Sequence, residues 1–344
     1  MKPSISCIMS NYNTDPDMFR QALESVLDQT YRDFELILID DKSSDKKSKE
    51  VMDEYVRRDA RIVAIDNQQN KGLAGALNEG LNIANGEYIA RFDTDDICVT
   101  NRFEQQLKYM EMNDLDLCGT FAHLFGDDEK VVSTSFSSCE EVAVQLLFTC
   151  YLYHPSVMIK RSFLEEHKLR YDVEYDGAED FDLFSRCREA GARINIMPEV
   201  MIHYRLHSNS VCHTQNAKQV RLSNAICRRQ LDHMGITYNS EEWLCQQILC
   251  GLAQYSFDLY LPVEKWCRKL IQGNCKNSYF DKRAFAEVVY NRFLTAVIKS
   301  DLGVADKLST ILGNRNLRCW SNIHSVIYKK AFALKYQLKG RGRE

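Results

Sequence analysis

Residues 86–96 read GEYIARFDTDD, a strand-like run that ends abruptly in aspartates. A second strand-like run, residues 34–39, ends in the same way at Asp40 and Asp41. Ligands of open α/β sheets bind outside the carboxyl ends of the strands, so two acidic strand ends predict a ligand site. Acidic residues also favour loops and helix starts, where Asp96 would act as an N-cap. Two such ends together favour the functional interpretation.

The chain alternates strand and helix patterns on both sides of this stretch. Strands are predicted over 5–9, 34–39, 61–65, 87–92 and 115–119, and helices from Pro16 and over 44–57, 72–84 and 101–112. Repeated units of this length predict an α/β fold with a mostly parallel sheet and helices on both faces.

The regular alternation ends near residue 120. Residues 120–175 mix short strands with a helix around 140–150, a further helix begins near 178 and ends at Gly191, and strands are expected over 193–197 and 200–204. From about residue 214 the pattern is helical. We therefore expect an α/β domain over 1–212 and a helical C-terminal region over 213–344.

The composition is that of a globular protein. The 344 residues are 45% hydrophobic and 27% charged, and a formal net charge of −4 argues against a dedicated nucleic-acid binder. The 13 cysteines form no C-x-x-C pair, which favours reduced thiols in the core. Without a signal-peptide pattern or an apolar stretch of membrane-spanning length, we expect a soluble cytoplasmic protein.

Three groups of residues carry chemistry. Asp93 and Asp95 offer two carboxylates a residue apart, a pair that suits a hard cation such as Mg²⁺ or Mn²⁺. Glu179 and Asp180 begin a helix, whose dipole tends to keep a carboxylate ionised. The pair has two interpretations: one of its carboxylates is a base for an acceptor hydroxyl, or both are acidic first-turn residues that match the dipole. The run 203–207, HYRLH, offers histidine and arginine for a metal or a diphosphate.

Together these segments resemble the family 2 glycosyltransferases, which have the GT-A fold. The resemblance covers 5–13, 25–31, 38–45, 70–74, 86–96, 178–183 and 204–207, in that order. It departs from the family pattern at Lys42, where a glycine is usual, and at Ser10-Asn11, where Pro-Thr is common. Neither departure removes a functional side chain.

The resemblance implies a role for each matching residue. Those that would bind the nucleotide sugar are Ser10, Tyr12, Asn13, Asp40, Asp41, Lys71, Asp93, Asp96 and Arg205. The ligands of Mn²⁺ or Mg²⁺ would be Asp95, Asp93 and His207. Asp180 would be the catalytic base of a single in-line displacement that inverts the anomeric configuration.

The resemblance also implies a substrate class. The donor would be a UDP-sugar carrying a hexose or N-acetylhexosamine, and the acceptor a saccharide, often lipid-linked, in the synthesis of bacterial O-antigen, capsule or lipooligosaccharide. Residues 327–344 carry six basic residues against Glu344, with aromatic residues between them. This tail is a candidate for peripheral binding to the anionic inner face of the cell membrane, and a solvated basic end explains it equally well.

Two other functions fit parts of the pattern. A nucleotidyltransferase shares acidic strand ends, but its Gly-rich, Arg-containing phosphate loop is missing from residues 10–13. A non-catalytic nucleotide-sugar-binding subunit would need no base, yet every acidic position is present.

Overall fold

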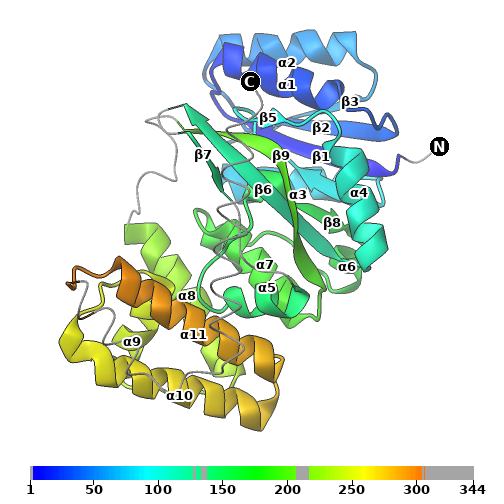
Figure 1. The fold of residues 1–344 in the computed structure, drawn as a ribbon. Coiled ribbons are helices and arrows are strands. Elements are labelled where there is room, and N and C mark those ends of the chain that lie inside the picture. The colour runs from blue at the N-terminus through cyan, green and yellow to red at the C-terminus, as the bar shows by residue number, and fades with distance from the viewer. Residues whose placement is uncertain (1–2, 127–128, 133–137, 207–216, 304–305, 307–344) are drawn as a thin grey trace. The chain divides into compact units, whose positions relative to one another are not determined.

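The computed structural model describes residues 3–126, 129–132, 138–206, 217–303 and 306. The chain divides into two compact units (Figure 1). Of the described residues, those up to 132 and those over 152–206 form the first, an α/β unit, and those over 138–151 and from 217 on form the second, a helical unit.

The α/β unit is built on a sheet of nine strands among the described residues, ordered β3-β2-β1-β4-β8-β6-β9-β5, with β7 beside β6. The strands are β1 Ile5–Asn11, β2 Phe34–Asp40, β3 Ile62–Asp66, β4 Tyr88–Arg91, β5 Ile97–Cys98, β6 Leu117–Gly126, β7 Lys130–Val132, β8 Met158–Lys160 and β9 Ile194–Leu206. The pairs β1–β2, β2–β3, β1–β4 and β6–β9 are parallel, and β8, β5 and β7 pair antiparallel. The predicted α/β class is confirmed, and the sheet is mixed.

Helices connect the strands of this unit along the chain. They are α1 Pro16–Leu27, α2 Lys46–Arg58, α3 Gly72–Ile83, α4 Arg102–Asn113, α6 Arg161–Glu166 and α7 Glu179–Glu189. Figure 1 shows α1 and α2 together above β1, β2 and β3. The path from β3 to β4 runs back past β1, so a right-handed crossover places α3 on the opposite face. The direction reverses between β1 and β4, where such sheets bind ligands.

The second half of the sheet differs from the prediction. The strand expected over 115–119 continues to Gly126, and the two strands expected over 193–204 are one strand, β9. Its pairing with β6 shifts register around Phe121, close to Pro198, which cannot donate a ladder hydrogen bond. A bulge therefore lets one long strand continue where the local pattern suggests an interruption.

The helical unit packs the apolar faces of its helices together, and Trp266, which is 1% exposed, lies in its core. Its helices are α5 Cys139–Gln145, α8 Ala217–His233, α9 Ser240–Cys250, α10 Tyr260–Asn277 and α11 Lys282–Lys299. Helix α5 belongs here because it packs on α11, and Gln230 Nε2 of α8 donates to the Leu146 carbonyl at 2.7 Å. A single boundary at residue 212 does not capture this, since the helical unit also contains residues 135–151.

Candidate active site

Four strands end at one edge of the sheet and carry the predicted site residues there. β1, β2 and β4 are parallel neighbours, and β9 runs in the same direction through its pairing with β6. The segment after β4 is tied to β9, because Ile97 of β5 pairs with His203. The segment after β4 is also tied to the loop after β1, because the side-chain hydroxyls of Thr14 and Thr94 lie 2.7 Å apart.

The paired aspartates after β2 are buried and hold loops together. Asp40 accepts from the Asn11 side chain at 2.9 Å and from the Ser43 amide at 3.1 Å. Asp41 accepts from the Asn67 side chain at 2.8 Å and, with both oxygens, from the Lys71 amide at 2.9 and 3.1 Å. The Asp41 carboxylate therefore fixes the start of α3 against the end of β2.

The residue after these aspartates explains one departure from the family pattern. Lys42 has a backbone φ of +63°, a left-handed conformation that glycine adopts without steric cost. This accounts for the glycine that is usual at the position. The lysine keeps the same turn at some cost in strain.

The loop after β1 presents one exposed aromatic ring. Tyr12 is 55% exposed, whereas Asn13 is committed to the loop, since its side-chain oxygen accepts from the amides of Ser44 and Asp45 at 2.8 Å each. Ser10 lies in β1 opposite Ile39. Tyr12 is thus placed to offer an apolar face to a planar group.

Asp93, Asp95 and Asp96 form an acidic cluster after β4. One oxygen from each carboxylate lies within 4.8 Å of the others. Burial, together with the charges of Asp93 and Asp95, raises the pKa of Asp96 well above its usual range. In the described part of the chain, its buried Oδ2 has no hydrogen-bond partner. Three hard oxygen donors and an unpaired buried carboxylate oxygen fit a divalent cation such as Mg²⁺ or Mn²⁺.

Arg205 holds this cluster in place from β9. Its amide donates to Asp96 Oδ1 at 2.8 Å, its Nε donates to the Asp95 carbonyl at 2.8 Å, and its guanidinium stacks on Phe125 at 4.5 Å. In this structure the arginine organises the acidic loop. His207, the predicted third metal ligand, lies outside the described residues.

Glu179 and Asp180 begin α7, as the sequence predicts, but the predicted effect of the helix dipole is wrong. Burial raises the pKa of Asp180, and burial with the Asp180 charge raises that of Glu179 to about 7. Desolvation of these carboxylates outweighs the favourable field of the helix N-terminus. The Asp180 charge also raises the pKa of Asp93, so the pair and the cluster lie within electrostatic reach.

Buried polar residues that the sequence reasoning missed support this pair. Glu179 Oε2 accepts from the Gly177 amide at 2.7 Å, and its Oε1 lies 3.8 Å from His154 Nδ1. His154 Nε2 lies 2.8 Å from the Tyr171 hydroxyl, and burial lowers the histidine pKa. Arg91 was missed too, although a charged residue in an otherwise apolar strand was a visible signal. Lys71 pairs with Glu79 on the surface.

The sheet and the acidic residues at its switch point have the arrangement expected of a GT-A glycosyltransferase, and the comparison with known families decides the class. Residues 6–167 match the model of the family described as Glycosyl transferase family 2. The chain belongs to this family, and the protein is a transferase enzyme. Both alternatives from the sequence, a nucleotidyltransferase and a non-catalytic subunit, are disfavoured by this membership.

Named relatives and solved structures agree with this assignment. An uncharacterized glycosyltransferase of Methanocaldococcus jannaschii is 34% identical over 210 residues, which cover 60% of this chain and 71% of that protein. The Escherichia coli UDP-Glc:alpha-D-GlcNAc-diphosphoundecaprenol beta-1,3-glucosyltransferase WfaP is 30% identical over 64% of this chain and 85% of its own length. The structure of S. aureus TarS 1-349 in complex with UDP-GlcNAc aligns with a TM-score of 0.59 at 14% identity, over 90% of this chain and 92% of that one, and shows the shared fold.

Proposed function

We propose that the protein is an inverting glycosyltransferase that moves a hexose or N-acetylhexosamine from a UDP-sugar to a saccharide hydroxyl. One observation carries the proposal. Three carboxylates with oxygens within 4.8 Å lie at the switch point of the sheet, within electrostatic reach of a buried carboxylate pair at the start of a helix. The carboxylates of the cluster would hold a divalent cation that offsets the diphosphate charge, and the buried pair offers a base for an acceptor.

The donor side uses the strand ends of β1, β2 and β4. Asp41 and Tyr12 flank the proposed nucleobase pocket, with Asp40, Ser10 and Asn13 shaping the loops around it and Lys71 beside it. Asp93, Asp95 and Asp96 would hold Mn²⁺ or Mg²⁺, which when bound offsets the charge that grows on the leaving diphosphate. Arg205 keeps the Asp95–Asp96 segment in position.

Asp180 is the proposed base on the acceptor side. Burial raises the pKa of Asp180. A carboxylate with a raised pKa is a stronger base, so it removes the proton of a hydroxyl group more effectively. The hydroxyl then attacks the anomeric carbon from the face opposite the leaving diphosphate. Glu179, held by Gly177 and His154, shapes the turn that presents Asp180.

The relatives suggest the substrates. The name of WfaP specifies UDP-Glc and a diphosphoundecaprenol-linked GlcNAc, and TarS has been solved with UDP-GlcNAc. We therefore extend the proposal to a lipid-linked saccharide acceptor in the synthesis of bacterial surface polysaccharide, in the cytoplasm or at the inner face of the membrane. Among the described residues, no helix is long and apolar enough to cross a membrane. The basic tail, which would contact the anionic leaflet, lies outside the described residues.

A donor screen tests the proposal. The wild-type protein is incubated with Mn²⁺ and UDP-glucose, UDP-galactose or their N-acetyl forms, and UDP release is measured with and without saccharide acceptors. We expect one donor to be used at least tenfold faster than the others. Asp180→Asn should bind that donor normally and lose transfer by two orders of magnitude or more, in line with the loss of a general base. Absence of UDP release from every nucleotide sugar would refute the proposal.

A further inference from the structure

The buried arginine of β4 is unusual for its position. Arg91 follows Tyr88, Ile89 and Ala90 in a strand buried along its whole length, and the arginine itself is 4% exposed. A guanidinium removed from water costs several kcal/mol unless a negative partner and hydrogen bonds compensate. Its burial therefore calls for a role that a neutral residue would not fill.

The arginine pairs with the first carboxylate of the acidic cluster. Arg91 Nη1 donates to Asp93 Oδ2 in an ion pair whose arginine side is 5% exposed and whose aspartate side is 27% exposed. A charge-assisted bond of this kind, held by a side chain locked in the interior, fixes the orientation of the carboxylate. Asp93 is thus held by a buried partner, while part of its own side chain stays exposed to solvent.

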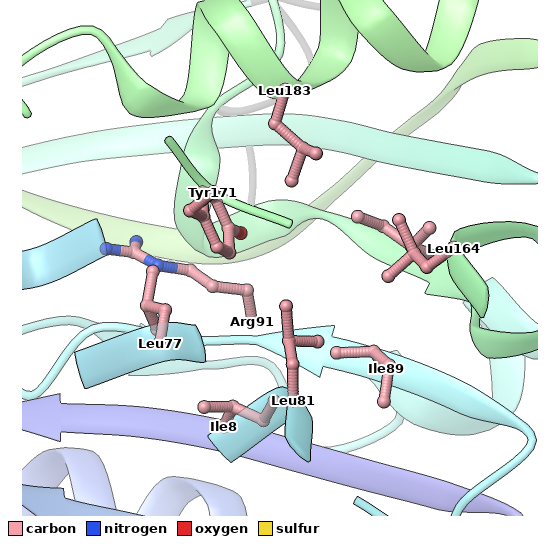
Figure 2. A pocket seen from close by; sticks show the side chains of 9 residues that line it. Ile8, Leu77, Leu81, Ile89, Arg91, Leu164, Tyr171 and Leu183 are labelled. Carbon is pink, nitrogen blue, oxygen red and sulfur yellow. The ribbon is translucent and has the colours of Figure 1, made fainter. Parts of the chain in front are cut away.

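The rest of the arginine lines a small apolar cavity. Figure 2 shows its side chain between Leu77 and Tyr171, with Leu81 and Leu183 also facing the space. The cavity has room for about one water molecule. Arg91 Nε has no hydrogen-bond partner in the described ranges, whereas Nη1 donates to Asp93.

The same charge acts on the catalytic pair. The Arg91 guanidinium favours the ionised forms of Asp93, Asp96, Glu179 and Asp180, and so lowers the pKa of each against the larger effect of burial. It also disfavours a charge on His154, which neighbours Glu179. One buried cation therefore counters the mutual repulsion of carboxylates on both sides of the site.

We propose that Arg91 is a positioning residue that orients the Asp93 carboxylate for binding of a divalent cation and the donor diphosphate. The inference rests on the proposed function, because it assumes a nucleotide diphosphate and metal at the acidic cluster. Arg91 is buried and acts through Asp93 without touching the substrate.

A binding cycle tests this role. Wild type, Arg91→Met, Asp93→Asn and the double variant are titrated with UDP in the presence of Mn²⁺ by calorimetry, and thermal unfolding of each is recorded. We expect Arg91→Met to weaken binding about tenfold, the loss typical of a 1.4 kcal/mol contribution. In the Asp93→Asn background the same change should alter the Kd by less than about twofold, because the residue through which Arg91 acts is already neutral. Arg91→Lys should recover part of the affinity, since it keeps the charge without the planar fork.

Each contrary outcome has a distinct meaning. If Arg91→Met lowers the unfolding temperature and leaves the Kd unchanged, Arg91 is purely structural and the inference fails. If it weakens binding equally with and without the Asp93 carboxylate, the action does not run through Asp93, and the inference again fails. If Arg91→Met does not fold, Arg91→Lys replaces it in the cycle, and equal losses in both backgrounds overturn the inference. If wild type itself does not bind UDP with Mn²⁺, the proposed function fails with it.

Discussion

Glu179 shows how the environment of one carboxyl group links the site to stability. It is 6% exposed, and burial together with the charge of Asp180 raises its pKa from 4.5 to about 7. Below about pH 4.5 the folded and unfolded states both hold the proton, so the shift has no effect. As the pH rises towards 7 the unfolded state releases the proton first, and folding becomes less favourable.

Glu179→Gln removes this penalty, because the amide does not titrate. We expect the free energy of unfolding of the variant, relative to wild type, to increase by about 2 kcal/mol between pH 5 and pH 8. Urea denaturation of both proteins at the two pH values measures the difference. A constant difference across this range would show that Glu179 is not held at a raised pKa.

The residue types of the site were readable from the sequence, but their electrostatic states were not. Asp93, Asp95 and Asp180 could be proposed as site residues because acidic residues at strand and helix ends form a local pattern. The raised pKa of Asp180 depends on burial, which distant segments create. Arg91 could have been noticed as a charged residue in an apolar strand, but its pairing with Asp93 and its depth of burial became clear only in the structure.

At the scale of elements, the turn before β4 approaches the start of β1 closely, where the parallel pairing of the two strands begins. Gly86 donates its amide to Ser6 Oγ at 2.8 Å. A Cβ atom added at Gly86 would lie 2.4 Å from the Ser6 amide nitrogen and 2.7 Å from the Ile5 carbonyl carbon. These are backbone atoms of a central strand, which cannot move aside without disturbing the parallel pairing of β1 with β4.

Gly86→Ala should therefore destabilise the protein by about 2–3 kcal/mol, a typical cost of overpacking. Gly303→Ala is a suitable control, because its added Cβ would meet Asp306 at an ordinary 3.5 Å. Chemical denaturation of both variants measures the costs. Equal stabilities would mean that the β1–β4 approach tolerates a side chain.

Elements with strong local patterns were predicted well, and those that depend on distant pairing were not. The prediction placed β1 to β4 and their helices within a few residues, because apolar periodicity and caps are local signals. The length of β6 and the continuity of β9 depend on their mutual pairing across a bulge. Pro198 suggests a break between two strands, but pairing with β6 on both sides of the bulge keeps β9 continuous.

At the scale of the whole molecule, membership of a unit escaped the sequence reasoning. The helical segment before residue 151 looks like part of the first domain, yet it packs on α11, far along the chain. Contacts between distant segments, including the hydrogen bond from Gln230 to the Leu146 carbonyl, decide such an assignment. The predicted domain boundary thus remains a simplification of a chain that enters the helical unit twice.

The basic tail is a prediction for the whole molecule, since it concerns where the enzyme meets its acceptor. Residues 327–344 carry six basic residues, each contributing on the order of 1 kcal/mol near an anionic surface. Removal of residues after 326 should weaken binding to phosphatidylserine vesicles and slow transfer to a lipid-linked acceptor, while a short soluble acceptor is used normally. Sedimentation with vesicles at low and high salt measures the binding. Equal binding of intact and truncated protein would identify the tail as a solvated end.

The most direct test of the central claim is the metal dependence of UDP release at the acidic cluster. Purified wild type and Asp95→Asn are assayed with the preferred UDP-sugar, first with Mn²⁺ and then with excess chelator. Asp95 is half-buried in the bend after β4, and the amide has the same shape as the carboxylate, so the unfolding temperature should stay within about 2 °C of wild type. We predict that either the chelator or the substitution lowers UDP release at least a hundredfold, and that added Mn²⁺ restores the chelated wild type alone. Full turnover in excess chelator, or in Asp95→Asn, would contradict a metal-assisted transfer at this site.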